Sequence, residues 1–385
     1  MRIAIFTDTF LPQVNGVTNT LGRMGEYLEL KGIAYIFITP DQKKDGNLPF
    51  NTESFFSYPL FIYPECRFAV PNMLRLNKRL DAFQPDVILS MTEFNMGLAG
   101  LAYGKKRKIP VVTNYSTNFG TILNSYNLNV LGNALEKYLS WFHNEADMTL
   151  TPSVESQKKL ENMGVPKTAL FKRGIDFERF DPRHRNSQYR QDAGIDDKLV
   201  LLYVGRLSPE KDLDILRDAM HRLNDNYQDQ IALVITGEGP MSAELKKSMP
   251  ANVLFTGYKK GRELAEIYAS CDVFAFPSSF ETFGNVVLEA FASGLPVVGV
   301  AEGGVKGLVR HGENGYLAEP RDVDSFVACV EKVITNEFLR RRFGTNGRAY
   351  AKTNSWQAVF DDLMDIFKSL QNTFGQSSND TKAAN

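Results

Sequence analysis

Short apolar runs alternate with segments of helical apolar spacing along most of the chain, and this alternation limits the folds it can adopt. The run at 3–6 precedes a helix expected at about 18–31, with Gly32 as its stop. A strand, a helix and a second strand in this order predict a parallel sheet. The same plan predicts further buried strands at 35–39, 86–90, 110–114, 148–151, 199–204, 231–236, 253–257, 273–276 and 296–300.

The chain has 385 residues, which is too long for one ordinary α/β domain and predicts two domains of about 150–200 residues each. The periodicity weakens over 172–198, where we place the hinge. We therefore predict doubly wound domains at 1–185 and 186–355, an amphipathic helix at 356–370 and a disordered polar tail at 371–385. The first strand is not followed by G-x-G-x-x-G, which argues against NAD or FAD.

Composition excludes several classes of function. The formal net charge of −1 argues against a general nucleic-acid binder. Cys66, Cys271 and Cys329 lie far apart, so neither a zinc site nor a disulfide framework is expected. The first apolar run becomes polar too soon for a signal peptide, and no run reaches the roughly 18 residues of a membrane span. These features favour the cytoplasm.

Residues 278–289 join a buried strand to a helix that is expected to open near Gly284. A helix N-terminus leaves backbone N–H groups free and carries partial positive charge, which suits a phosphate. Glu281 lies in the loop and Glu289 in the helix, with seven residues between them. Two such carboxylates could hold two hydroxyl-rich parts of one ligand around its phosphates. A loop acid and an unrelated solvated helix acid would have the same spacing.

Arg206 and Lys211 flank the loop that follows the strand at 199–204. Two cations at the carboxyl end of a strand would counter a diphosphate, and an arginine can grip it bidentately. Two surface cations without a ligand are the alternative reading. Gly16, ahead of the first helix, could let the backbone approach a phosphate or sugar, or be an ordinary turn glycine.

A basic amphipathic segment at 71–83 carries Arg75, Lys78 and Arg79, and a second basic cluster lies at 105–108. Together they could rest on an anionic membrane surface. The alternative is a core-facing helix with a solvated charged side, followed by a basic loop.

Several of these segments together resemble one family. The chain resembles the retaining glycosyltransferases of family 4, which have the GT-B fold, over about residues 1–370. Glu281 and Glu289 resemble the family's E-x7-E signature, 205–211 resembles its G-R-x-x-x-x-K segment, and 10–17 resembles its first glycine loop. Lipid-directed members are the most similar: GDP-mannose-dependent α-mannosyltransferases and sulfoquinovosyl or glucosyl transferases of diacylglycerol.

The resemblance implies two Rossmann-like parallel-sheet domains with a cleft between them. The N-terminal domain would bind the acceptor, the C-terminal domain would bind the nucleotide-sugar donor, and the helix at 356–370 would cross back to the first domain. Arg206 and Lys211 would bind the donor diphosphate and stabilise it as a leaving group, Glu281 would hold hydroxyls of the transferred sugar, and Glu289 those of the ribose. The remaining donor contacts would come from Gly16, Tyr258, Thr282, Phe283, Gly284, Asn285 and Val286.

The chain departs from the family in the loop after the strand at 110–114. Many members have a histidine there, whereas this chain has Tyr115, Ser116 and Asn118. Asn118 can form a hydrogen bond in the catalytic site but cannot act as a base. Tyr115 and Ser116 would contact the acceptor. In a same-face transfer, the leaving phosphate itself accepts the acceptor's proton.

The resemblance therefore implies a metal-independent, cofactor-free, retaining transfer of a hexosyl group of the mannose or glucose type. The donor would be GDP-mannose or a UDP-hexose, and the acceptor a lipid or glycan, with peripheral contact to an anionic membrane at the inner face of the cell membrane. Two alternatives remain open. One is a nucleotide-sugar epimerase of the same fold, and the other is a catalytically silent nucleotide-sugar-binding protein, suggested by the absent loop histidine.

Overall fold

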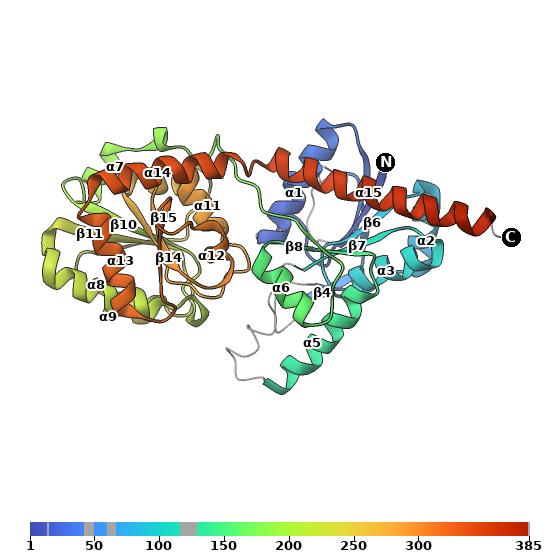
Figure 1. Cartoon of the computed structure of the whole chain (residues 1–385), viewed down its shortest axis with the longest axis horizontal. Coiled ribbons are helices and arrows are strands. Elements are labelled where there is room, and N and C mark those ends of the chain that lie inside the picture. The colour runs from blue at the N-terminus through green and yellow to red at the C-terminus, as the bar shows by residue number, and fades with distance from the viewer. Residues whose placement is uncertain (14, 42–49, 60–66, 116–128, 384–385) are drawn as a thin grey trace. The chain divides into compact units, whose positions relative to one another are not determined.

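The computed structural model describes residues 1–13, 15–41, 50–59, 67–115 and 129–383 (Figure 1). The chain forms two compact units. Unit 1 comprises Met1–Lys172 and Gln357–Asn385, and unit 2 comprises Arg173–Trp356. The division falls before the boundary at 185/186 that the sequence predicts.

Unit 1 contains a seven-stranded sheet in the order β3-β2-β1-β6-β7-β8-β9, and every neighbouring pair is parallel. The buried apolar runs of the sequence form its central strands, as predicted. The short strands β3 and β9 were not predicted. The bounds are β1 (Arg2–Phe6), β2 (Ala34–Pro40), β3 (Thr52–Phe55), β6 (Val87–Ser90), β7 (Val111–Asn114), β8 (Met148–Thr151) and β9 (Thr168–Leu170).

The helices of unit 1 flank this sheet, and a separate antiparallel hairpin is formed by β4 (Ser57–Pro59) and β5 (Arg67–Ala69). In α2, Leu76 and Leu80 are fully buried, which confirms a core-facing helix. The helix bounds are α1 (Gly16–Leu30), α2 (Met73–Phe83), α3 (Asn95–Arg107), α5 (Asn129–Asn144), α6 (Val154–Asn162) and α15 (Trp356–Ala383).

The terminal helix α15 corrects one prediction. The sequence predicts disorder from residue 371, but the helix continues to Ala383. No proline interrupts this stretch, so its polar composition does not break the helical backbone. Within unit 1, α15 packs on α1, where the Tyr27 hydroxyl donates a 2.6 Å hydrogen bond to Asp361 and the rings of Tyr27 and Phe360 lie 5.2 Å apart.

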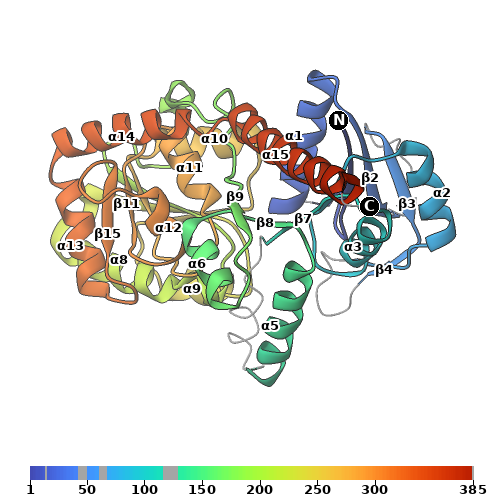
Figure 2. The same cartoon turned by 45° about the vertical axis from the view of Figure 1, so that its right-hand side comes forward.

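Unit 2 contains a six-stranded parallel sheet in the order β12-β11-β10-β13-β14-β15, with helices on both faces (Figure 2). Its strands are β10 (Leu199–Val204), β11 (Ile231–Thr236), β12 (Val253–Gly257), β13 (Val273–Ala275), β14 (Val297–Val300) and β15 (Gly315–Ala318). Its α-helices are α7 (Ser187–Asp192), α8 (Leu213–Tyr227), α9 (Ser242–Ser248), α10 (Gly261–Ser270), α11 (Asn285–Ala292), α12 (Gly303–Leu308), α13 (Val323–Ile334) and α14 (Glu337–Lys352).

Each sheet reverses its strand order once. In unit 1 the reversal lies between β1 and β6, and in unit 2 it lies between β10 and β13. At such a switch point the loops leaving the carboxyl ends of the two strands diverge and leave a crevice, where doubly wound sheets bind ligands. The loops that follow β10 and β13 carry Arg206, Lys211 and Glu281.

Candidate active site

The loop after β10 supplies the two predicted cations. A short 3-10 turn, Pro209–Lys211, leads into α8, and the Tyr203 hydroxyl supports the loop by donating to the backbone oxygen of Arg206 at 3.2 Å. The side chain of Arg206 is exposed. Among the residues that the structure describes, none forms an ion pair with its guanidinium. This guanidinium is therefore free to bind an anion.

Lys211 and Glu281 form an ion pair across the switch point. The Lys211 Nζ lies 2.5 Å from Glu281 Oε1, and both side chains are more than four-fifths buried. Burial lowers the pKa of Lys211, but the carboxylates of Glu281, Glu210 and Asp212 outweigh it and raise that pKa above its ordinary value. Lys211 is therefore a fixed positive charge over the whole neutral range.

Asp212 ties the two loops together. Its carboxylate accepts a 2.9 Å hydrogen bond from the backbone N–H of Ser279, which lies in the loop after β13. Asp212 itself has a left-handed backbone with φ of 51°, a conformation that aspartate tolerates better than most residues. The turn thus fixes the position of Lys211 relative to the loop that carries Glu281.

The helix α11 begins at Asn285, as predicted, with Gly284 as its N-cap. Gly284 has φ of 98°, which favours glycine, and no side chain caps the helix, whose first N–H groups have no partner within the helix. The loop is held from the other side by Gly304, whose N–H donates to the Glu281 backbone oxygen at 2.6 Å. A Cβ on Gly304 would lie 2.5 Å from the Phe283 backbone, so only glycine fits this approach.

Glu289 lies in the second turn of α11 and is partly buried. It accepts a 2.9 Å hydrogen bond from the Tyr268 hydroxyl of α10. Burial raises the pKa of Glu289 to about 7, and the hydrogen bond from Tyr268 opposes this only in part. The two glutamates therefore differ: Glu281 is paired with a cation, and Glu289 is held near the point of protonation.

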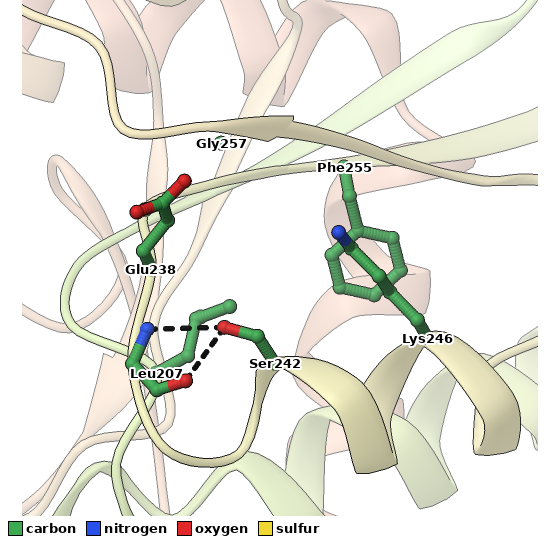
Figure 3. A pocket seen from close by; sticks show the side chains of 8 residues that line it. Leu207, Glu238, Ser242, Lys246, Phe255 and Gly257 are labelled. Carbon is green, nitrogen blue, oxygen red and sulfur yellow. Dashed lines mark hydrogen bonds between the residues drawn. The ribbon is translucent and has the colours of Figure 1, made fainter.

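A hollow of about 270 Å³ lies beside this site, at the carboxyl ends of β11 and β12 (Figure 3). Glu238 lies on one side of the hollow, and Lys246 lies on the other with its Nζ 5.8 Å from the centre of the Phe255 ring. Ser242 donates to the Gly239 backbone oxygen at 2.7 Å and so holds the turn that carries Glu238.

All the predicted donor-site residues except Gly16 belong to unit 2. Phe283 is buried, Val286 is partly buried, and Asn285 and Tyr258 are exposed, with Tyr258 directly after β12. Thr282 is partly buried in the same loop. Gly16 is the first residue of α1 in unit 1, and Tyr115 is buried after β7. Ser116 and Asn118 lie outside the described residues.

Unit 1 has a polar cluster at its own switch point that the sequence did not predict. Asp8, after β1, accepts hydrogen bonds from the Thr92 hydroxyl at 2.6 Å and the Met96 N–H at 3.0 Å. Burial raises the pKa of Asp8 to about 6. Nearby, Glu93 Oε1 lies 3.8 Å from Nε2 of the buried His143, and neither atom has a hydrogen-bond partner among the described residues. The polar residues that follow β1 and β6 could be read from the sequence. His143, however, comes from α5, a distant part of the chain that only the fold brings to them.

Comparison with known proteins agrees with this geometry. Residues 14–179 match the family described as Glycosyltransferase Family 4, and 186–350 match Glycosyl transferases group 1. A GDP-mannose-dependent alpha-mannosyltransferase of Mycobacterium tuberculosis is 32% identical over 96% of this chain and 97% of that protein. The chain belongs to glycosyltransferase family 4. It is a retaining glycosyltransferase that transfers a sugar from a nucleotide-sugar.

Two further comparisons give the range of the family. The sulfoquinovosyl transferase SQD2 of Arabidopsis thaliana is 30% identical over 93% of this chain and 71% of that protein. Anabaena Alr3699/HepE, in a crystal structure with UDP and glucose, superposes with a TM-score of 0.74 at 21% identity, covering 96% of this chain and 100% of that one. This likeness, with the two parallel sheets, gives the GT-B fold that the sequence predicts.

No described helix is long and apolar enough to cross a membrane. Nor does any group of three or more histidine, cysteine, aspartate or glutamate side chains in the described part of the chain have the arrangement of a metal site.

Proposed function

We propose that this family 4 enzyme transfers a hexosyl group of the mannose or glucose type to a lipid or glycan acceptor, from GDP-mannose or a UDP-hexose. The observation that carries the proposal is the ion pair of Lys211 and Glu281, together with the guanidinium of Arg206 from the same loop as Lys211, which has no ion-pair partner in the part of the chain that the structure describes. One cation is left for the diphosphate, and a second is already aligned with an acid that can bind sugar hydroxyls.

Each part of the donor has a matching group in unit 2. Arg206 and Lys211 bind the diphosphate and stabilise it as it leaves. The N–H groups at the start of α11, over Phe283–Val286, share its charge. Glu281 binds hydroxyls of the transferred sugar and Glu289 those of the ribose. The nucleobase lies over the hollow formed by Glu238, Lys246 and Phe255, close to Tyr258.

The acceptor hydroxyl attacks the anomeric carbon from the face that the diphosphate leaves. Its proton passes to the departing phosphate oxygen, so no protein base is needed, and the anomeric configuration is retained. Lys211 and Arg206 offset the negative charge that grows on the diphosphate as the glycosidic bond breaks. In unit 1, Tyr115 is the residue we assign to the acceptor. Transfer to a lipid would take place at the inner face of the cell membrane.

The test is a donor panel of GDP-mannose, UDP-glucose and UDP-galactose, with diacylglycerol, a monohexosyl diacylglycerol and a soluble polyol as acceptors. Mass spectrometry identifies the product and NMR its anomeric configuration, with and without a metal chelator. Metal-independent formation of an α-glycoside supports the proposal. A free donor that is epimerised without any acceptor, or one that binds in calorimetry without being consumed, would contradict it.

A further inference from the structure

The turn between β15 and α13 in unit 2 carries an arginine where the backbone favours glycine. Pro320 and Arg321 are its central residues, and φ of Arg321 is 59°. The Asp322 N–H closes the turn by donating to the Glu319 backbone oxygen at 3.3 Å. Proline followed by a residue with positive φ is the pattern of a type II turn, in which the second of the two is usually glycine or asparagine. The backbone of Arg321 is therefore strained.

The start of α13 holds this turn in place. Asp322 is the N-cap of the helix, and its carboxylate accepts a 3.0 Å hydrogen bond from the Ser325 N–H. The Ser325 hydroxyl oxygen in turn accepts one from the Glu319 N–H at 2.9 Å. The turn is thus held at both of its ends, and the backbone from which the Arg321 side chain projects is fixed.

The guanidinium of Arg321 reaches the two loops that carry the ion pair. Its Cζ lies 5.2 Å from the centre of the Phe280 ring, and its Nε lies 4.0 Å from Asp212 Oδ1. Phe280 directly precedes Glu281, and Asp212 directly follows Lys211. Arg321 therefore contacts a chain neighbour of each member of the pair.

The contact with Asp212 has a consequence for Lys211. The Ser279 N–H donates to Asp212 Oδ2, while Arg321 lies on the side of the other oxygen, Oδ1. The Asp212 carboxylate is mostly buried, and its charge already helps to raise the pKa of the neighbouring lysine. With no cation beside Oδ1, this carboxylate would compete with Glu281 for the Lys211 ammonium group.

Stability alone does not account for this arginine. Its side chain is 60% exposed, and at such a site an ion pair or a contact between a cation and a ring adds little to the stability of the fold. The strained backbone opposes even this gain. A strained residue whose contacts lead to a ligand site points to a role in that site.

We propose that Arg321 is a positioning residue that sets the geometry of the Lys211–Glu281 pair. It holds Phe280, and with it the glutamate, from one side, and it keeps the Asp212 carboxylate from drawing the lysine away. Arg321 acts through these two protein contacts and needs none with the donor. The inference rests on the proposed function, in which the pair meets the diphosphate and the sugar.

The main test is Arg321→Gly, because glycine relieves the turn and removes the guanidinium together. Its Tm should equal or exceed that of the wild type. Its kcat, measured with GDP-mannose and with UDP-glucose, should fall about tenfold or more with little change in KM, since the pair offsets charge that grows only in the transition state. Arg321→Lys keeps the charge but lacks the planar guanidinium, so it should recover part of kcat. A crystal structure of the glycine variant should show Lys211 moved toward Asp212.

Two controls match the two changes. Arg310→Ala removes another exposed guanidinium of unit 2, which lies 5.5 Å from the centre of the Tyr350 ring and 3.7 Å from a Glu313 carboxylate oxygen. Gln84→Gly relieves another left-handed backbone, with φ of 51°, at the end of α2. Both variants should keep the kcat of the wild type.

A glycine variant with wild-type kcat overturns the inference. So does one whose kcat and Tm fall together, because the arginine would then be only structural. Lys211→Ala in the same assay tests the proposed function separately: full turnover removes the role of the pair, whereas an inactive Lys211→Ala beside a fully active Arg321→Gly removes the inference alone. If the wild type turns over neither nucleotide sugar, the crystal structure of the glycine variant decides, and an unchanged contact between Lys211 and Glu281 overturns the inference.

Discussion

Lys211 Nζ and Glu281 Oε1 lie 2.5 Å apart although seventy positions separate the two residues in the chain. They meet because β10 and β13 are neighbours at the point where the strand order of unit 2 reverses. The pair raises the pKa of Lys211 and so keeps the lysine charged. The ion pair is thus the part of the site on which the proposed chemistry depends most.

Removing either member of this pair should nearly abolish transfer. We expect Lys211→Ala and Glu281→Ala each to lower kcat/KM by about 10²–10³, the usual loss when a preorganised electrostatic group is removed. The kcat/KM of the double variant should be only slightly lower than that of the less active single variant, because the two residues act as a unit. The control is Arg341→Ala, which removes a largely exposed cation from α14 of the same unit. Near-normal turnover by either single variant would rule out the assigned roles.

A methyl group at Gly304 should disturb the donor site without changing any charge. The added Cβ would lie 2.5 Å from the Phe283 backbone. The hydrogen bond that the Gly304 N–H donates to the Glu281 backbone oxygen would be strained as a result. We expect Gly304→Ala to destabilise unit 2 by about 1–3 kcal/mol and to weaken donor binding more than tenfold. Gly22→Ala on α1 is the control, since its Cβ has ordinary room. Calorimetric donor binding equal to that of Gly22→Ala would contradict the prediction.

Glu238 should favour guanine over uracil. Its carboxylate faces the hollow beside the site and can accept from both N1–H and the 2-amino group of guanine, whereas uracil offers one N–H (Figure 3). A hydrogen bond to a charged group is worth about 1.5–3 kcal/mol, so Glu238→Ala should weaken GDP binding roughly 10- to 100-fold and UDP binding much less. Glu244→Ala, on the surface of α9, is the matched control. Equal losses for the two nucleotides would show that this carboxylate does not distinguish the bases.

The sequence was most informative where long-range pairing was not needed. The apolar runs at 199–204 and 231–236 became β10 and β11, and Gly284 caps α11 as its position before an apolar helical pattern predicted. The hairpin strands β4 and β5 were missed because they are three residues long and turn their aromatic residues, Tyr58 and Phe68, toward solvent.

The hollow beside Glu238 could not be derived from local pattern. It arises because parallel pairing brings the ends of β11 and β12 together, with α9 supplying Lys246. The same reason explains why His143 was not connected with Glu93 in unit 1: the two residues lie on different elements that only the tertiary fold brings together. Pairings of this kind depend on the register of whole strands and helices, which short motifs do not encode.

Glu289 should make stability and donor binding respond to pH in opposite directions. Its pKa is raised from the ordinary value of 4.5 to about 7, chiefly by burial. Between these values the folded protein holds a proton that the unfolded chain has lost, so this contribution to stability is present at low pH and is lost as the pH rises through about 7. We expect it to amount to about 1–3 kcal/mol.

Donor binding should change the other way, because a deprotonated carboxylate accepts more hydrogen bonds from ribose hydroxyls than a protonated one does. The KM for the donor should therefore rise as the pH falls below about 7. The Glu289→Gln variant should have a raised KM for the donor that depends little on pH. Its free energy of unfolding should no longer decrease as the pH rises through about 7. Denaturant unfolding and donor titrations at pH values on both sides of 7 measure the two effects. A wild-type profile in the glutamine variant would show that another group titrates, and would remove Glu289 from the ribose site.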